Sequence, residues 1–173
     1  TTSSTPIGEN ASGHMQFDTV RPEIAELLFQ LKNRGDRTAA GPIIQTAAHF
    51  LSQHRDKFDA IVPVPPSHQR TVQPVIILAE GIGAALGVPV LSCITTTRQT
   101  SQLKNITDPE QRRAHVEGLY QVEEKQTRGR RILLFDDLFR SGTTMNAITD
   151  ILIYQGKAAE VHALTITKTR SNQ

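Results

Sequence analysis

The residues best suited to chemistry lie in one stretch, 131–145, which reads RILLFDDLFRSGTTM. Two consecutive carboxylates, Asp136 and Asp137, follow an apolar run, and the sequence SGTT comes next at 141–144. Hydroxyl groups and the N–H groups of a first helical turn donate hydrogen bonds to anions, and Gly142 lets the backbone approach a ligand closely. The stretch therefore predicts a phosphate-binding cup beside a pair of carboxylates.

The two carboxylates restrict what such a cup can bind. They repel an isolated anion, so the ligand should also offer hydrogen-bond donors, as the vicinal hydroxyls of a ribose do. Asp136 and Asp137 can accept from these hydroxyls while residues 141–144 hold a 5-phosphate on the same sugar. The alternative is an acidic turn in which a serine or threonine caps a helix. That alternative explains SGTT but leaves two carboxylates at the end of a buried strand unexplained.

The elements that must position these residues alternate between helix and strand. Apolar spacing predicts helices over 22–35, 38–54, 73–86 and 143–155, and short apolar runs predict strands over 58–64, 88–94, 118–122, 132–135 and 160–168. This alternation predicts an α/β fold with a mostly parallel central sheet flanked by helices, and ligands of such sheets bind beyond the carboxyl ends of the strands. Residues 95–115 are polar without apolar periodicity, which is typical of a lid or binding loop.

Composition excludes several classes of protein. The single cysteine, Cys93, cannot form an internal disulfide or a cysteine-based metal module, and it favours a cytoplasmic setting. No apolar run approaches the roughly 20 residues that span a bilayer, so no membrane association is expected. A net charge of +2 does not predict direct nucleic-acid binding, although basic residues outnumber acidic ones between Arg98 and Arg131.

The first residues differ from the rest of the chain. Residues 1–14, TTSSTPIGENASGH, are rich in small polar residues and show no periodicity. We interpret them as an expression scar or a disordered leader and expect one domain over residues 15–173.

The stretch 131–145 resembles the phosphoribosyl-diphosphate (PRPP) motif of type I phosphoribosyltransferases. That motif is an apolar strand, two acids, a few residues, then Ser or Thr, Gly, any residue and Thr. The resemblance implies a type I phosphoribosyltransferase fold with a flexible hood loop, and it implies that Asp136 and Asp137 hold the ribose hydroxyls. The 5-phosphate would then be bound by the loop residues Arg140, Ser141, Gly142, Thr143 and Thr144.

Other segments are similar, in order, to the ComF family of competence-related phosphoribosyltransferase homologues. They are LKNRGDRTAAGPI at 31–43, IVPVPPSHQR at 61–70, TRQTSQL at 97–103 and RRAHVEGLY at 112–120, and the likeness spans about residues 21–168. It does not include the family's N-terminal zinc ribbon. The family's Arg-Gly-Phe-Asn-Gln stretch is shortened to residues 71–73, and His115 replaces the usual Asn.

The resemblance also implies a pyrophosphate site. In type I enzymes the loop after the first strand of the sheet binds pyrophosphate through backbone N–H groups, and Pro65 and Pro66 have none. The available donors are Ser67, His68, Gln69 and Arg70, with a proline-rich turn as the alternative interpretation. The hood loop offers three cations to offset the charge of leaving pyrophosphate, although each is equally well explained as a solvated charge: Arg98, Lys104 and Arg112.

Together these features predict a Mg-dependent phosphoribosyltransferase that binds PRPP and displaces pyrophosphate with a nitrogen nucleophile. Its catalytic residues would be Asp136, Asp137 and Arg98. Magnesium would be held through PRPP, with the two aspartates as outer partners and no direct protein ligand. The alternative is a non-catalytic PRPP-sensing or DNA-uptake-associated module. A homodimer and a partner in the DNA-uptake machinery are both compatible with the resemblance.

Overall fold

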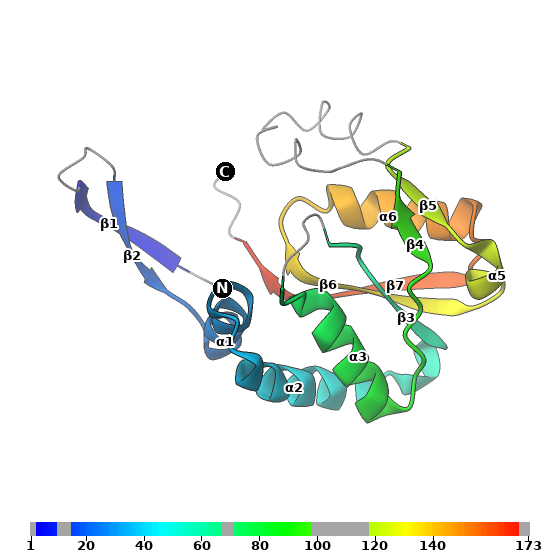
Figure 1. The fold of residues 1–173 in the computed structure, drawn as a ribbon, viewed down its shortest axis with the longest axis horizontal. Helices are drawn as coiled ribbons and strands as arrows, with labels where there is room; N and C mark the ends of the chain where they lie inside the picture. The colour runs from blue at the N-terminus through cyan, green and yellow to red at the C-terminus, as the bar shows by residue number, and fades with distance from the viewer. Residues whose placement is uncertain (1–2, 10–14, 67–70, 98–117, 170–173) are drawn as a thin grey trace.

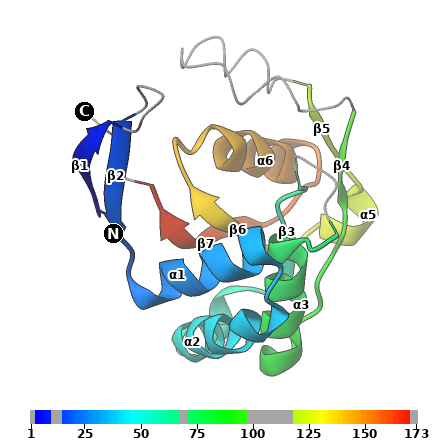
Figure 2. The same cartoon turned by 60° about the vertical axis from the view of Figure 1, so that its left-hand side comes forward.

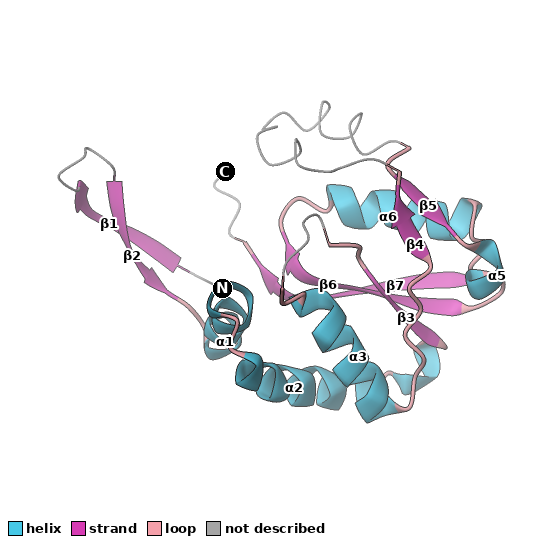
Figure 3. Ribbon diagram, viewed as in Figure 1, coloured by secondary structure: helices cyan, strands magenta, loops and turns pink. Residues whose placement is uncertain are grey.

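In the computed structural model, residues 3–9, 15–66, 71–97 and 118–169 are described, with the backbone alone for 3–9 and 15–20. A three-stranded parallel sheet is central, in the order β3-β6-β7, and helices flank it (Figures 1 and 3). Its strands are β3 (Ala60–Pro63), β6 (Arg131–Phe139) and β7 (Glu160–Lys168). The remaining strands form two antiparallel pairs: β1 (Ser3–Glu9) with β2 (Met15–Val20), and β4 (Ile94–Thr96) with β5 (Tyr120–Val122).

The helices follow the predicted pattern closely. They are α1 (Glu23–Phe29), α2 (Ala40–Ser52), α3 (Pro74–Leu86), α5 (Glu124–Thr127) and α6 (Thr143–Tyr154), with the π-helix η1 (Gln30–Arg34) and the short 3-10 helices η2 (Arg37–Ala39) and η3 (Arg55–Lys57). Gly35 ends the first helical segment at φ 69°, a left-handed conformation that favours glycine. No helix in the described ranges is long and apolar enough to cross a membrane.

The sheet is buried on both faces. Ile61, Leu133 and Phe135 pack against helices α1, α2 and α3, whereas Val62 and Leu134 face the opposite cluster, which includes residues of α6, β4 and β5. Figure 2 shows α1, α2 and α3 on one side of the sheet and α6 on the other. Strands covered on both faces must be apolar throughout, which is why β3 and the first half of β6 contain almost no polar residue. The predicted α/β fold with flanking helices is confirmed.

The strands differ from the prediction in two places. The segment 88–94 forms only an isolated parallel bridge, Ile61 to Val90, before β4 begins at Ile94. The predicted strand 132–135 extends to Phe139 because β7 continues beside it and pairs Asp136 with Thr165. The prediction placed the end of this strand at the end of the apolar run, whereas the two aspartates lie inside the strand and not in a loop after it.

The N-terminal residues also differ from the prediction. Ser3–Glu9 forms strand β1, which pairs antiparallel with Met15–Val20, whereas no element was predicted for residues 1–14. The hairpin projects from the rest of the structure near α1 (Figure 1). Single-sequence periodicity missed it because β1 contains mainly small polar residues. The expression-scar origin of residues 1–14 and the domain boundary at residue 15 stay predictions.

Candidate functional site

The candidate site lies where β6 continues past its neighbour β3. The parallel pairing of β3 with β6 ends at Pro63 and Phe135, and the Val64 N–H still donates to the Phe135 carbonyl at 2.8 Å. Beyond this point β6 pairs with β7, and it carries Asp136 and Asp137 at the carboxyl edge of the sheet. This is the place where α/β sheets bind their ligands, and the role of the two carboxylates in binding stays a prediction.

Asp137 is buried and ion-paired. Its side chain is 10% exposed, and the Lys32 Nζ donates to Oδ1 at 3.0 Å and to Oδ2 at 2.8 Å. Lys32 comes from the π-helix η1, far from Asp137 in sequence. Lys32 was not among the predicted site residues, although it lies in the segment LKNRGD that carries the family resemblance. A partner at such a separation leaves no periodic or motif signal, so only the fold reveals it.

Asp136 has a different environment. Its Oδ1 accepts a hydrogen bond from the Asp137 N–H at 2.8 Å, and within the described part of the chain no cation forms a salt bridge with it. Burial, together with the charge of Asp137, raises the pKa of Asp136 to about 6, against hydrogen bonds from backbone N–H groups and the charge of Lys32. A carboxyl with such a pKa is typical of a functional site, because the protein does not compensate its charge in full.

The predicted phosphate cup corresponds to the turn between β6 and α6. Gly142 has φ 78°, a conformation that favours glycine, and a Cβ added there would crowd the Phe139 ring at 3.2 Å. Ser141 and Thr143 bring their hydroxyl oxygens to 3.0 Å from each other. The first N–H groups of an α-helix have no partner within the helix, so those at the start of α6 are suited to bind an anion.

The helix-capping alternative does not describe this turn. The residue that precedes α6 is Gly142, and no side chain caps the helix. The structure therefore uses SGTT to shape a turn at the start of α6, with Arg140 and Ser141 exposed.

Tyr120 contributes to the same region and was not among the predicted site residues. It is the first residue of β5 and is only 6% exposed. Burial raises the pKa of the Tyr120 phenol; a hydrogen bond with Thr144 opposes this effect and the charge of Asp136 adds to it. The side chain therefore lies close to both the cup and Asp136, which connects β5 to the site.

Several predicted site residues lie outside the described residues: Ser67, His68, Gln69, Arg70, Arg98, Lys104 and Arg112. The described ends of the hood segment are held together, since the Thr97 N–H donates to the Leu119 carbonyl at 2.8 Å and its hydroxyl donates to the Gly118 carbonyl at 2.9 Å. The described residues on either side of 98–117 thus lie beside Tyr120.

Solved structures define the class of fold. Glutamine PRPP amidotransferase from B. subtilis, complexed with ADP and GMP, has a TM-score of 0.55 and is 19% identical, covering 91% of this chain and 34% of that one. Adenine phosphoribosyltransferase from Saccharomyces cerevisiae has a TM-score of 0.54 and is 14% identical, covering 97% of this chain and 83% of that one. The fold is that of type I phosphoribosyltransferases, as the PRPP-motif resemblance implied.

The sequence comparison is more specific. The chain is 24% identical over 156 residues to the competence protein ComFC of Bacillus subtilis (strain 168). The aligned region covers 87% of this chain and 62% of that protein. The chain thus spans less than two thirds of this curated relative. No family model matches. The predicted resemblance to the ComF family is confirmed by this similarity.

Proposed function

We propose that this chain is a phosphoribosyltransferase that binds PRPP with Mg²⁺ and displaces pyrophosphate with a nitrogen nucleophile. One observation carries the proposal: Asp136, Asp137 and the SGTT turn lie on consecutive elements at one sheet edge. Carboxylates that accept from vicinal hydroxyls, beside helix N–H groups that bind phosphate, match the two ends of a ribose 5-phosphate.

The proposed magnesium ion would be held mainly by its ligand, with the aspartates as outer partners. No group of three or more His, Cys, Asp or Glu side chains that could hold a metal occurs within the described ranges. Both oxygens of Asp137 already accept hydrogen bonds from Lys32. The carboxylate that could interact with a magnesium ion is therefore mainly that of Asp136. Mg²⁺ commonly keeps several waters and binds substrate phosphates, and when bound here it would neutralise charge on the diphosphate.

The chain's own groups would contribute mainly position and charge. Asp136 and Asp137 would orient the ribose, the SGTT turn would hold its 5-phosphate, and pyrophosphate would leave C1 as the nitrogen nucleophile adds. Holding both ends of the sugar fixes C1 relative to the incoming group. We extend the proposal to the pyrophosphate contacts that the resemblance implies: residues 67–70, Arg98, Lys104 and Arg112.

Calorimetric titration with Mg²⁺ and either PRPP or ribose 5-phosphate tests the binding step. We expect both ligands to bind and to raise the melting temperature, because a ligand that binds only the native state stabilises it by mass action. Absence of binding at millimolar ligand would contradict the proposal. A screen of purine and pyrimidine bases and of amines, read by pyrophosphate release, then tests the transfer and identifies the acceptor.

The similarity to ComFC supports a second candidate, a non-catalytic PRPP-sensing or DNA-uptake-associated module. Type I phosphoribosyltransferase folds alone do not decide between these functions. Both candidates predict PRPP binding to the same site. Only the enzyme predicts pyrophosphate release with an acceptor, so PRPP binding without turnover across the screen would favour the sensor.

A further inference from the structure

The two adjacent aspartates are held in unlike ways. Lys32 donates to both oxygens of Asp137, at 3.0 and 2.8 Å, and this carboxylate is the less exposed member of the pair. Asp136 accepts from the N–H of its neighbour and is partly exposed. The Asp137 carboxylate is therefore ion-paired with Lys32, whereas the Asp136 carboxylate lies at the sheet edge and accepts hydrogen bonds from the backbone.

This asymmetry matters for binding an anion. A phosphate carries negative charge, and two ionised carboxylates beside the cup would repel it. Pairing one of them with Lys32 removes most of that charge without removing a hydroxyl acceptor, because Asp136 is still present. Loss of Lys32 would leave a buried, uncompensated carboxylate, which is strongly unfavourable, next to the site for a dianionic ligand.

The backbone around Lys32 indicates that its placement is specific. Residues Gln30–Arg34 form a π-helix at the end of α1, where the Gly35 N–H donates to the Gln30 carbonyl. The Asp36 N–H also donates to the Gln30 carbonyl, at 3.2 Å. A π-turn is wider than an α-turn and is frequent at functional sites, because it changes the direction of side chains along a helix. Leu31 is fully buried and anchors this turn, and the next residue reaches Asp137.

We propose that Lys32 is a positioning residue that holds and neutralises Asp137, so that Asp136 is the carboxylate of the pair that meets the hydroxyls of the ligand. This inference rests on the proposed binding of a ribose 5-phosphate group. It assigns unequal roles to two residues that the sequence motif presents as equivalent.

Titration of ribose 5-phosphate at pH 8 into four proteins tests it: the unaltered chain, Lys32→Met, Lys32→Met/Asp137→Asn and Lys32→Met/Asp137→Asn/Asp136→Asn. We expect Lys32→Met to weaken binding by about ten- to a hundredfold, because it creates an uncompensated carboxylate near the phosphate. The double variant should return to within about threefold of the unaltered chain, since the amide that replaces the Asp137 carboxylate carries no charge to compensate. The triple variant should lose affinity again, by about tenfold or more, because Asp136 is gone.

Controls separate this role from a general effect on folding. Lys57→Met removes another lysine that is ion-paired with an aspartate, Asp56, and should leave binding unchanged because that exposed pair lies at the opposite edge of the sheet. Lys32→Arg keeps the charge and should retain most of the affinity. Far-ultraviolet circular dichroism and melting curves establish that each variant is folded.

The outcomes decide between alternatives. If Lys32 itself binds the ligand, the double variant stays as weak as Lys32→Met, and the inference is wrong. If Asp137 is the hydroxyl acceptor, the double variant is weaker still, which also overturns it. If the unaltered chain does not bind ribose 5-phosphate, the proposed function fails and the inference fails with it. Binding by the unaltered chain without rescue in the double variant overturns the inference alone.

Discussion

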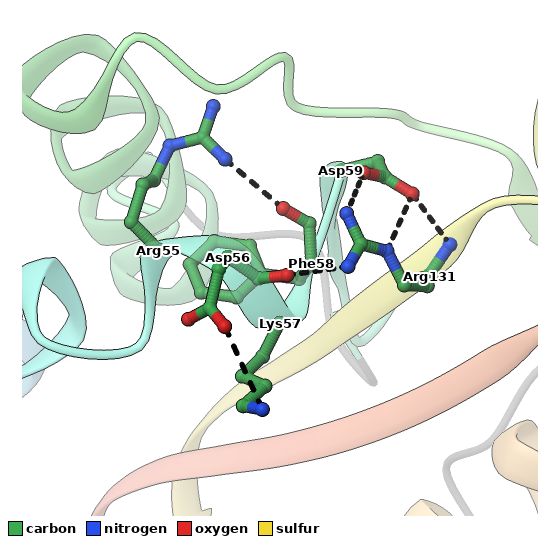
Figure 4. A network of polar contacts seen from close by, with 6 residues as sticks. All are labelled: Arg55, Asp56, Lys57, Phe58, Asp59 and Arg131. Carbon is green, nitrogen blue, oxygen red and sulfur yellow. Dashed lines mark hydrogen bonds and ion pairs between the residues drawn. The ribbon is translucent and has the colours of Figure 1, made fainter.

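At each end of strand β6 an aspartate lies near a cation, yet the pKa of the aspartate is lowered at one end and raised at the other. At the amino end, Asp59 Oδ2 accepts from the Arg131 N–H at 3.0 Å, and its Oδ1 accepts from Nη2 at 2.6 Å (Figure 4). Hydrogen bonds from the Arg131 side chain and backbone lower the pKa of Asp59 to about 2. At the carboxyl end, burial raises the pKa of Asp136 to about 6.

The opposite pKa shifts distinguish a structural ion pair, at Asp59, from a candidate binding site, at Asp136. The amino-end pair joins the start of β3 to the start of β6, and Arg131 adds a hydrogen bond to the Asp56 carbonyl. At this end the hydrogen bonds from Arg131 compensate the charge of the Asp59 carboxylate without a ligand. At the carboxyl end Lys32 satisfies Asp137 and leaves Asp136 in an environment that disfavours its charge. Such a residue lowers stability, and the proposed ligand binding would explain why it is retained.

The largest expected effect is on ligand binding. Replacing both Asp136 and Asp137 by Asn should weaken PRPP affinity by about tenfold or more, because the ribose hydroxyls lose the charged acceptor at Asp136 and a hydrogen bond to a charged group contributes about 1.5–3 kcal/mol. The fold should persist, since Asn keeps the shape of both side chains. Calorimetric titration measures the affinity, and Asp59→Asn is the matched control at the other edge, expected to bind normally. Equal affinity in the double variant and the unaltered chain would mean that the pair has only a structural role.

The second prediction concerns stability. Because its folded-state pKa is raised, Asp136 binds its proton more tightly in the native state than in the unfolded state. Stability therefore falls as pH rises from about 4 through about 6 and then levels off. Asp137, Lys32 and Tyr120 are the titratable groups around it. Asp136→Asn should be more stable than the unaltered chain at pH 8, by about 1–3 kcal/mol. Denaturant unfolding at pH 4, 6 and 8 tests this, and a variant that is less stable at pH 8 contradicts it.

The third prediction concerns the turn that shapes the cup. Gly142→Ala should destabilise the chain by about 1–2 kcal/mol and should weaken phosphate binding, because φ 78° is left-handed and the new Cβ would crowd the Phe139 ring. Gly129→Ala is a suitable comparison, since Gly129 has φ 70° but open space around it. It should lose similar stability without any change in ribose 5-phosphate affinity. Loss of affinity in both variants would show that the effect is global.

Much of this architecture was predictable from local sequence. The apolar run ILLF and the β-branched stretch before Pro65 indicated buried parallel strands, and SGTT after two acids indicated the cup. These signals are local. A strand that is buried on both faces must be apolar throughout, and a left-handed turn favours glycine at one fixed position. Lys32 and Tyr120 were not predictable in this way, because they reach the site only through tertiary packing. The extension of β6 was missed since pairing with β7, and not apolar content, continues the strand.

The smallest expected effect is at the amino end of β6 and has the opposite sign to that of Asp136. Because the pKa of Asp59 is lowered to about 2, its stabilising contribution is complete above about pH 4 and is lost as pH falls toward 2. Asp59→Asn should therefore be slightly less stable than the unaltered chain at pH 7, and the difference should shrink between pH 4 and pH 2. Its size should be modest, since both side chains are partly exposed and solvent screens the pair. Melting curves at pH 2, 4 and 7 on both proteins measure it. A difference that stays constant on acidification would mean that the contribution of Asp59 does not depend on its charge.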